Sequence, residues 1–399
     1  MRDCVRKASI APCDRAVSLS AERLRAALDG VFAGIAGSTA GSCIALSGGL
    51  DSTVLLAGIA ELAGRGDVAL WQPVRAIHVD HGLHRDAVRW SEHCASVARS
   101  LGIGCEIVRV DARPGPGESP EAAARAARYG ALAERLRAGE VLLTAHHADD
   151  QLETVLLQWL RGGGLRSIAG MSPVAPFASG WHARPLLGFT RDELRDWGGA
   201  AGLVWLEDPS NLDISFDRNY LRLEVLPAVR RRWPAAARTV GRVARQAAGA
   251  LELDAEAAAA DLGAAREAGT LSLPAMRVLA PPRQRRLLRA WLREAGMPIP
   301  AAATLEALRQ DVLAAADDRV PRVCWPGVVV HRYRERLYAA AASTEEPPWS
   351  PGAWRPGEAF DLGWLGKLEL QPAQGDGLSR ARLTGPLAVE PRPSGGSFQ

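Results

Sequence analysis

The stretch ALSGGLDSTVLL, Ala45 to Leu56, decides how the first part of the chain is expected to fold. A hydrophobic run is interrupted here by Ser47, Gly48 and Gly49, and a sequence typical of a helix follows. A strand that enters such a turn directs backbone N–H groups to the positive end of the next helix, which favours anions. Glycines let the backbone approach a phosphate closely. The stretch therefore predicts a phosphate-binding loop.

This loop lacks the lysine of the commonest phosphate-binding loop. Lys7 and Lys367 are the only lysines among 48 basic residues, and neither is near the loop. The hydroxyls of Ser47 and Ser52 can add hydrogen-bond donors. Asp51 would repel a bare phosphate, so its expected role is to hold a Mg²⁺ ion that bridges phosphate oxygens. The alternative is a glycine-rich turn in which Asp51 is an ordinary first-turn acid.

Apolar runs alternate with amphipathic, helix-like segments in the first part of the chain, which is typical of a parallel sheet covered on both faces. Ser119 as N-cap and Pro120 at the first position are expected to begin one of these helices. In such sheets ligands bind beyond the carboxyl ends of the strands. The expected strands are 42–47, 74–80, 105–110 and 140–147, and the expected helices are 50–64, 86–101, 119–138 and 149–160.

Composition sets wider limits. The chain has 399 residues, of which 47% are hydrophobic and 23% charged, with a net charge of +3. We expect two or three domains. No apolar run approaches the roughly 18 residues of a membrane span, and no signal peptide is evident, so a cytoplasmic protein is expected. The six cysteines include no C-x-x-C pair, which argues against structural zinc, a redox dithiol and a cysteine-held iron–sulfur cluster.

Other polar motifs follow the expected strands. VDHGLHRDA (79–87) places His81 and His84 after the second strand, where two histidines beside an acid and an arginine favour a site over a buried core. On the third helix Arg125 and Arg128 are three residues apart and share one face, although a solvated charged face is the alternative.

TAHHADDQLET (144–154) crowds five ionisable side chains at a strand-to-helix junction. Such crowding is unfavourable unless the side chains bind cations or polar substrate. His146, Asp150 and Glu153 share one side if the helix starts early, and Gln151 and Thr154 are expected to support them.

Two later segments are candidates for binding RNA. RGGGLRSIAGM (161–171) is a basic glycine loop that begins at Arg161, and EDPSNLDISFDRNYLR (207–222) carries Arg218, Asn219 and Arg222. The segment from Phe216 to Gln246 contains eight arginines and two acidic residues, which gives a local net charge of +6. Such a basic helical face suggests an RNA backbone as partner, with solvated helices as the alternative.

The S-G-G-L-D-S sequence closely resembles the signature of the PP-loop ATP pyrophosphatases, which implies cleavage of ATP between the α- and β-phosphates. Several motifs taken together resemble the bacterial tRNA(Ile)-lysidine synthetases. The matching pieces are LSGGLDSTVLL, RAIHVDHGL, EAAARAARY, AHHADDQLET, RGGGLRSIAGM, RPLL and EDPSNLDISFDRNYLR.

The resemblance implies a Rossmann-like PP-loop domain of the adenine nucleotide alpha hydrolase type over 20–226. A mainly helical tRNA-binding domain is expected at 227–341, with a hairpin at 323–341, and a linker with an incomplete β-containing domain at 342–399. Family members usually continue past a GGxxF stretch into a basic segment. Here the sequence reaches SGGSFQ, so a truncated last domain with a weaker grip on the tRNA body is expected.

The implied reaction uses ATP and Mg²⁺ to adenylate C2 of the wobble cytidine in a CAU anticodon. The ε-amine of L-lysine then displaces AMP and gives lysidine, which reads AUA instead of AUG. By the resemblance, His146, Asp150 and Glu153 surround cytidine and lysine, while Arg218 and either Arg125 or Arg128 stabilise phosphate or the flipped base. The residues implied for ATP are Ser47, Gly48, Gly49, Leu50, Asp51 and Ser52, with Asp51 on the metal.

Three other functional classes fit the sequence less well. A tRNA thiolase needs clustered cysteines, and a PP-loop amidotransferase needs a glutaminase domain or an N-terminal cysteine. A non-catalytic tRNA-binding protein would need losses in the loop, yet the loop residues are all present. The expected partners are the tRNA and L-lysine, with no membrane, and a homodimer is left open.

Overall fold

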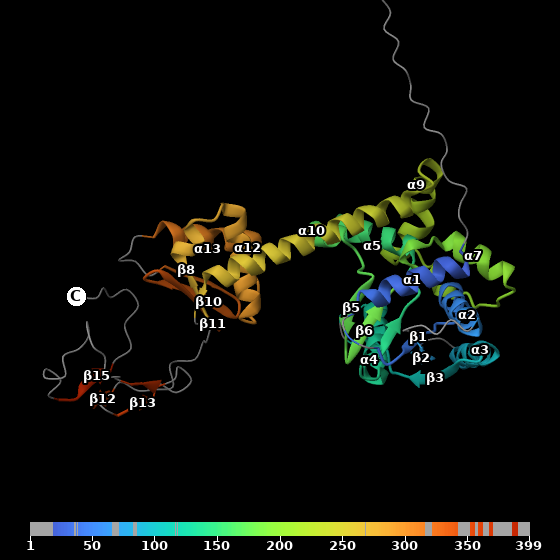
Figure 1. Ribbon diagram of the computed structural model, residues 1–399, viewed down its shortest axis with the longest axis horizontal. Helices are drawn as coiled ribbons and strands as arrows, with labels where there is room; N and C mark the ends of the chain where they lie inside the picture. Colours follow the sequence, from blue (N-terminus) through green and yellow to red (C-terminus); the bar gives the residue numbers. More distant parts are fainter. Residues whose placement is uncertain are drawn as a thin grey trace, which may run out of the picture. The chain divides into compact units, whose positions relative to one another are not determined.

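A computed structural model defines the fold as two compact units, residues 1–253 and 254–399, each of which is described by itself (Figure 1). The residues that the structure describes are 19–35, 37, 39–65, 72–82, 86–115, 117, 119–267, 269–315, 321–341, 352–355, 358–361, 367–369 and 385–389.

The first unit is organised around a six-stranded sheet in the order β3-β2-β1-β4-β6-β5. Neighbouring strands run parallel except for β5, which pairs antiparallel with β6 at the edge. The predicted parallel α/β fold is therefore confirmed, with one antiparallel strand added. The strand bounds are β1 Ser42–Ala45, β2 Val74–Asp80, β3 Gly104–Arg109, β4 Val141–Leu143, β5 Val174–Phe177 and β6 Gly180–Ala183.

The helices between these strands lie where the sequence pattern predicts them. Ser119 is the N-cap of α4 and Pro120 its first residue, as expected. The helices of this unit are α1 Ala21–Ala33, α2 Leu50–Gly64, α3 Ala87–Ser100, α4 Pro120–Arg135, α5 Ala148–Leu160, α6 Leu165–Ile168, α7 Arg191–Ala200, α8 Asp217–Tyr220 and α9 Leu226–Arg232. Short turns of other helix types are η1 Pro185–Gly188, η2 Pro209–Leu212 and η3 Leu221–Val225, and α10 Ala236–Ala265 crosses the boundary between the units.

Both faces of the sheet are buried, because successive residues of each strand point to opposite sides. In β1, Ile44 packs with residues of α1, α2, α3 and α7, whereas Cys43 packs with Leu132 of α4 on the other face. In β4, Leu143 and Leu142 divide in the same way. Burial on both faces leaves the ends of the strands as the accessible part of the sheet.

The second unit combines helices with an antiparallel sheet in the order β7-β8-β11-β10-β9. The expected hairpin is present as β10 Val328–Tyr333 and β11 Arg336–Ala341, and β9 Arg322–Trp325 extends it. The sequence pattern missed β7 Arg266–Glu267 and β8 Thr270–Ser272, which are short and pair with a strand far along the chain. The helices are the end of α10, α11 Leu273–Arg277, α12 Pro281–Glu294 and α13 Ala302–Ala314.

The last part of the chain contains two short antiparallel pairs, β12 with β15 and β13 with β14. These strands are Gly352–Trp354, Phe360–Asp361, Lys367–Leu368 and Leu387–Val389 in chain order. Most of the predicted linker and last domain lies outside the described residues. Across the described helices, a stretch that combines the length and the hydropathy of a membrane span does not occur.

Arg332 is expected to be a main stabilising residue of the second unit. Its guanidinium is almost fully buried and donates to the carbonyl oxygens of Val312 (3.1 Å) and Ala315 (2.7 Å), at the end of α13. Arg332→Met leaves these carbonyls without their donor and is expected to lower the free energy of unfolding by about 3 kcal/mol.

Guanidinium unfolding followed by circular dichroism measures this change. Arg322→Met, at an exposed position of β9, is the matched control and is expected to change the free energy by less than about 0.5 kcal/mol. Equal midpoints for the two variants would contradict the capping role.

Candidate active site

Polar residues from three neighbouring strands meet at the carboxyl edge of the first sheet. The loop of Ser47 follows β1, Thr144 to His147 follow β4, and His182 lies near the end of β6. Because β1 pairs with β4 and β4 pairs with β6, these segments are adjacent in space. This is the edge at which parallel α/β sheets bind ligands.

The loop after β1 has the geometry of an anion site. Gly48 has a φ of +81°, a conformation that favours glycine, and a Cβ placed there would lie 2.9 Å from the Sγ atom of Cys94. Gly49 is the N-cap of α2, so the helix begins at the end of the loop. The hydroxyls of Ser47 and Ser52 lie 3.0 Å apart. Hydroxyls and the positive end of a helix therefore converge where a phosphate can bind.

Asp51, in the first turn of α2, has a carboxylate oxygen available for a ligand. Its Oδ1 atom is buried and, among the described residues, has no hydrogen-bond partner. Its Oδ2 atom lies 3.6 Å from Nε2 of His147. No group of three or more His, Cys, Asp or Glu side chains in the described part of the chain is arranged to hold a metal ion. An ion bound by Asp51 would therefore need oxygens from a substrate or water, as Mg²⁺ sites commonly use.

His147 connects the Asp51 loop to α5 and is a site residue that the sequence reasoning left unassigned. It is the N-cap of α5, and its Nδ1 atom accepts hydrogen bonds from the backbone N–H groups of Asp149 (3.2 Å) and Asp150 (3.4 Å). Burial alone would lower the pKa of His147, but the carboxylates of Asp150, Asp51 and Asp149 outweigh burial and raise it. The position of the histidine directly before a predicted helix was the available signal for a cap.

Asp150 and Glu153 share two arginines. Glu153 is 1% exposed and accepts from Nε of Arg218 (2.8 Å) and from Nε and Nη2 of Arg222 (2.8 Å each). The same two arginines lie 3.5 and 3.4 Å from Oδ1 of Asp150. Burial opposes ionisation of Asp150, but His147, Arg218 and His146 together hold its pKa below the usual value. The four side chains form a compact cluster in which the two negative charges are balanced by two positive charges.

This cluster changes the expected use of Glu153. Both of its carboxylate oxygens are bonded to arginine, so its first role is to hold Arg218 and Arg222 in place. Its contact with lysine stays a prediction, and Asp150, whose side chain is 14% exposed, is the more accessible acid. Asn219 is buried and its amide donates to the carbonyls of Ser210 and Asp213 (both 2.9 Å). Asn219 thus braces the preceding loop, and its contact with tRNA also stays a prediction.

Arg125 and Arg128 lie together on α4, as their spacing predicts. Both guanidinium groups lie over the ring of Tyr129, at 4.9 and 5.5 Å from its centre. Tyr129 in turn packs against His182, with ring centres 5.8 Å apart. Burial, followed by repulsion from neighbouring arginines, lowers the pKa of Arg128. The arginine pair is therefore next to the part of the site formed by β6.

His146 lies in the loop before α5, because the helix begins at Ala148. The expected helical face shared by His146, Asp150 and Glu153 therefore does not form, although Asp150 and His146 are close enough for their charges to interact. Nδ1 of His146 lies 2.7 Å from the hydroxyl of Thr144. Thr144 is a site residue that the sequence pattern did not indicate.

Arg161 and His81 belong to two other predicted regions and are not part of the cluster of Asp150, Glu153, Arg218 and Arg222. Arg161 is exposed at the end of α5 and pairs with Asp217 at 2.7 Å. His81 follows β2 directly, after the buried Asp80. His84 and Arg85 lie outside the described residues.

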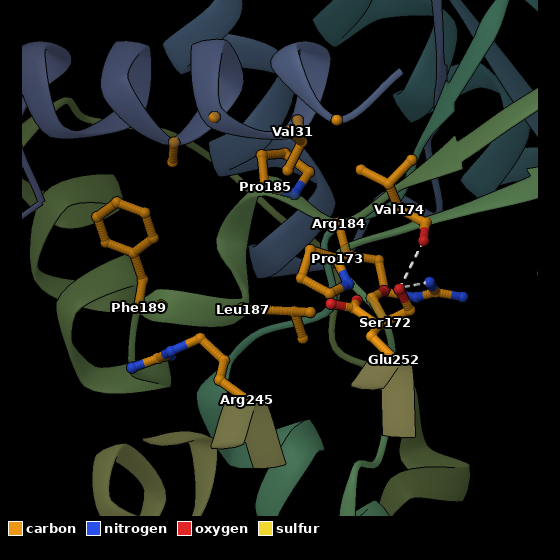
Figure 2. A pocket seen from close by; sticks show the side chains of 14 residues that line it. Val31, Ser172, Pro173, Val174, Arg184, Pro185, Leu187, Phe189, Arg245 and Glu252 are labelled. Carbon is orange, nitrogen blue, oxygen red and sulfur yellow. Dashed lines mark hydrogen bonds between the residues drawn. The ribbon is translucent and has the colours of Figure 1, made fainter. Parts of the chain in front are cut away.

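A pocket of about 530 Å³ in the first unit is lined mainly by residues of α1, η1 and α10 and by Ser172, Pro173 and Val174. Figure 2 shows side chains that line it, among them Val31 of α1, Phe189 and Arg245. It contains none of the predicted site residues, so its size does not identify the site. Arg184 also lines this pocket and hydrogen-bonds to His182, which places one arginine between the pocket and the carboxyl edge.

Comparison with known proteins matches both units of the chain. The PP-loop domain family matches residues 24–229, and the TilS substrate binding domain matches residues 271–338. The tRNA(Ile)-lysidine synthase of Alkalilimnicola ehrlichii is 44% identical over 82% of this chain and 72% of that protein. The enzyme of the same name from Methylococcus capsulatus is 42% identical over 89% and 80%. That from Coxiella burnetii is 37% identical over 90% and 79%.

Gly48→Ala tests the loop geometry. The new methyl group would meet Cys94, and the left-handed backbone conformation would be strained by about 1–2 kcal/mol, so the loop must shift. We expect ATP affinity, measured by titration calorimetry, to fall at least about tenfold, which corresponds to 1.4 kcal/mol. Gly64→Ala is the control, because nothing lies within 4 Å of its Cβ position. Unchanged affinity in Gly48→Ala would contradict the assignment of the loop.

Proposed function

The chain belongs to the tRNA(Ile)-lysidine synthase family, and we propose that it joins L-lysine to C2 of the wobble cytidine in the CAU anticodon of tRNA(Ile). ATP drives the reaction, AMP and pyrophosphate are released, and the chain acts as a ligase that forms a carbon–nitrogen bond. The observation that carries this proposal is the lysine-free loop of Ser47 to Ser52, which lies beside Asp150 at one edge of the sheet. One site can thus bring together the triphosphate, the base and the amine.

In the first step the oxygen on C2 of cytidine attacks the α-phosphorus of ATP, and pyrophosphate leaves. The hydroxyls of Ser47 and Ser52 and the N-terminus of α2 are proposed to bind the departing phosphates. This arrangement holds the leaving group and keeps a side chain off the α-phosphorus, which the oxygen must reach. A loop without lysine is suited to bind the leaving phosphates and to leave the α-phosphorus accessible.

We propose Asp51 as the residue that holds Mg²⁺. A hard cation prefers carboxylate oxygens, and the Oδ1 atom of Asp51 is buried without a partner among the described residues. When bound, the ion would neutralise charge on the phosphate oxygens. Asp51 is kept in place from the other side by His147 at 3.6 Å.

In the second step the ε-amine of lysine forms a bond to C2, the bond from C2 to the AMP oxygen breaks, and the proton that the amine loses passes to solvent. We propose that Asp150 attracts the lysine ammonium, because its pKa is held low and it stays ionised. Arg218 and either Arg125 or Arg128 are proposed to stabilise the charge on the phosphate of the leaving AMP.

The tRNA must present its cytidine outside the anticodon stack, which requires a few kcal/mol of unstacking. A surface that binds the RNA backbone can offset that energy. Arg161, exposed at the end of α5, and the arginines of α9 and the first half of α10 are proposed to bind phosphates. Arg222 is tied to Glu153, so we place it at the reacting centre rather than on this surface.

The cysteines favour this proposal over sulfur transfer. The described cysteines, Cys43, Cys94, Cys105 and Cys324, are all free thiols. Burial raises the pKa of Cys43 and of Cys94 to about 12, so neither is a thiolate at neutral pH. The thiols of Cys43 and Cys94 therefore suit packing and are poor nucleophiles.

The proposal is tested with purified protein, ATP, radiolabelled lysine and a transcript of the tRNA. We expect lysine to enter the RNA together with AMP and pyrophosphate release, and Asp51→Asn to remove both activities. Asp29→Asn, on the exposed side of α1, is the control and should behave as wild type. Pyrophosphate release with some other acceptor, and no lysine in the RNA, would overturn the proposed function.

Glu153→Gln separates two roles of this buried acid. The substitution keeps the shape but removes the charge that holds Arg218 and Arg222, so it is expected to slow adenylation as well as weaken lysine use, each by about tenfold or more. Pyrophosphate release without lysine and lysine incorporation are measured separately. A rise confined to the KM for lysine would instead show that Glu153 contacts the amino acid directly.

A further inference from the structure

A chain of hydrogen bonds runs from β6 to the reacting centre. Arg184 lies 3.0 Å (Nη2) from Nδ1 of His182, Nε2 of His182 lies 2.8 Å from Oγ1 of Thr144, and the same oxygen lies 2.7 Å from Nδ1 of His146. His182 and Thr144 are 4% and 7% exposed, so water does not easily replace these bonds. The distances alone leave the direction of each bond open.

The arginine at one end sets the direction. A guanidinium can only donate, so Nδ1 of His182 must accept and carries no proton. The proton of a neutral His182 is then on Nε2, which donates to Thr144. Nη1 of Arg184 is in turn anchored by the carbonyl oxygen of Ser172 at 2.6 Å, which fixes the orientation of the guanidinium.

The hydroxyl of Thr144 determines the direction of the next hydrogen bond, to His146. Its hydroxyl accepts from His182 and has a single hydrogen, which is left for Nδ1 of His146. Nδ1 of His146 therefore accepts, and the proton of this ring is on Nε2. If Nδ1 of His146 carried the proton instead, the hydroxyl would have to accept two hydrogen bonds and its own hydrogen would lose this partner.

From this geometry we infer that Arg184, His182 and Thr144 are positioning residues that fix His146 as the tautomer with its proton on Nε2. The inference rests on the proposed function only in placing His146 at the reacting centre. His146 then offers an N–H donor to an oxygen of the substrate. In that state it has no free lone pair with which to take a proton from the lysine amine.

The surroundings of His182 and His146 favour the neutral form of both rings. Burial, with Arg184 and His146, lowers the pKa of His182 to about 3. Burial, with repulsion by Arg184, Arg125 and Arg218, also lowers the pKa of His146 to about 3, despite the opposing attraction of Asp150. Both rings therefore carry one proton each at neutral pH, which is the condition under which a tautomer can be selected.

The tautomer can be observed directly in the full chain labelled with ¹⁵N-histidine. Long-range ¹H–¹⁵N correlation distinguishes protonated from unprotonated ring nitrogens, and His146→Gln assigns the signals. We expect His146 to be protonated on Nε2, and Thr144→Val to give a mixture of tautomers or the opposite one. Protonation on Nδ1 in the wild type, or an unchanged tautomer in Thr144→Val, would overturn the inference. No substrate is needed, so this result is independent of the proposed function.

Kinetics tests whether the tautomer matters to the reaction. Thr144→Val keeps the volume and removes the hydroxyl, and we expect a fall in kcat of about 10- to 100-fold with little change in KM. Thr144→Ser retains the hydroxyl and should restore most of the rate. Ser91→Ala is the control, since that buried hydroxyl has no hydrogen-bond partner in the described part of the chain.

The outcomes distinguish the positioning role of Thr144 from the proposed function. A wild-type rate in Thr144→Val, despite an altered tautomer, would overturn the positioning role. Equal losses in Thr144→Ser and Thr144→Val would also overturn it, because the hydroxyl retained in Thr144→Ser would then make no difference to the rate. A wild-type protein that transfers no lysine would remove the proposed function, while the NMR result would still decide the hydrogen-bond chain.

Discussion

The buried carboxylate of Glu153 is the constraint on which the centre of the site depends. A buried charge is tolerated only when it is paired and hydrogen-bonded, and Glu153 obtains both from Arg218 and Arg222. These arginines belong to α8 and η3, so the ion pairs fasten that segment to α5. The polar loop before α8 is attached to the same segment. At its start, the backbone N–H of Leu206 donates to the carbonyl oxygen of Gly48 at 2.9 Å. One buried acid thus links the phosphate loop, α5 and the arginine segment.

Two consecutive histidines experience opposite fields. The carboxylates around His147 raise its pKa, whereas burial, with repulsion from three arginines, lowers the pKa of His146 to about 3 despite the attraction of Asp150. The turn from β4 into α5 directs the two side chains to different sides, that of His147 toward Asp51 and that of His146 toward β6. The edge of the sheet therefore has an acidic part, suited to cations, and a basic part, suited to phosphate. A reaction that uses a metal–triphosphate and a cationic amine needs both parts.

The sequence predicted those features that depend on local pattern. The loop of Ser47, the strands around it and the arginine pair on α4 follow from spacing and periodicity, which neighbouring residues determine. It failed where distant segments meet. Glu153 looked like a free acid, because its arginines are 65 and 69 residues away. His182 and β8 were missed for the same reason, since each acquires its role only by pairing with a distant part of the chain.

The positive charges of the site come from arginine and not from lysine, and this difference affects the proposed chemistry. The adenylated cytidine is electrophilic at C2, and an unprotonated lysine side chain nearby would compete with the substrate amine for that carbon. Arginine stays protonated even when burial lowers its pKa, as at Arg128 and Arg184. It supplies positive charge without a free amine. The lysine missing from the phosphate loop is therefore consistent with the chemistry proposed here, because the nucleophile must come from the substrate alone.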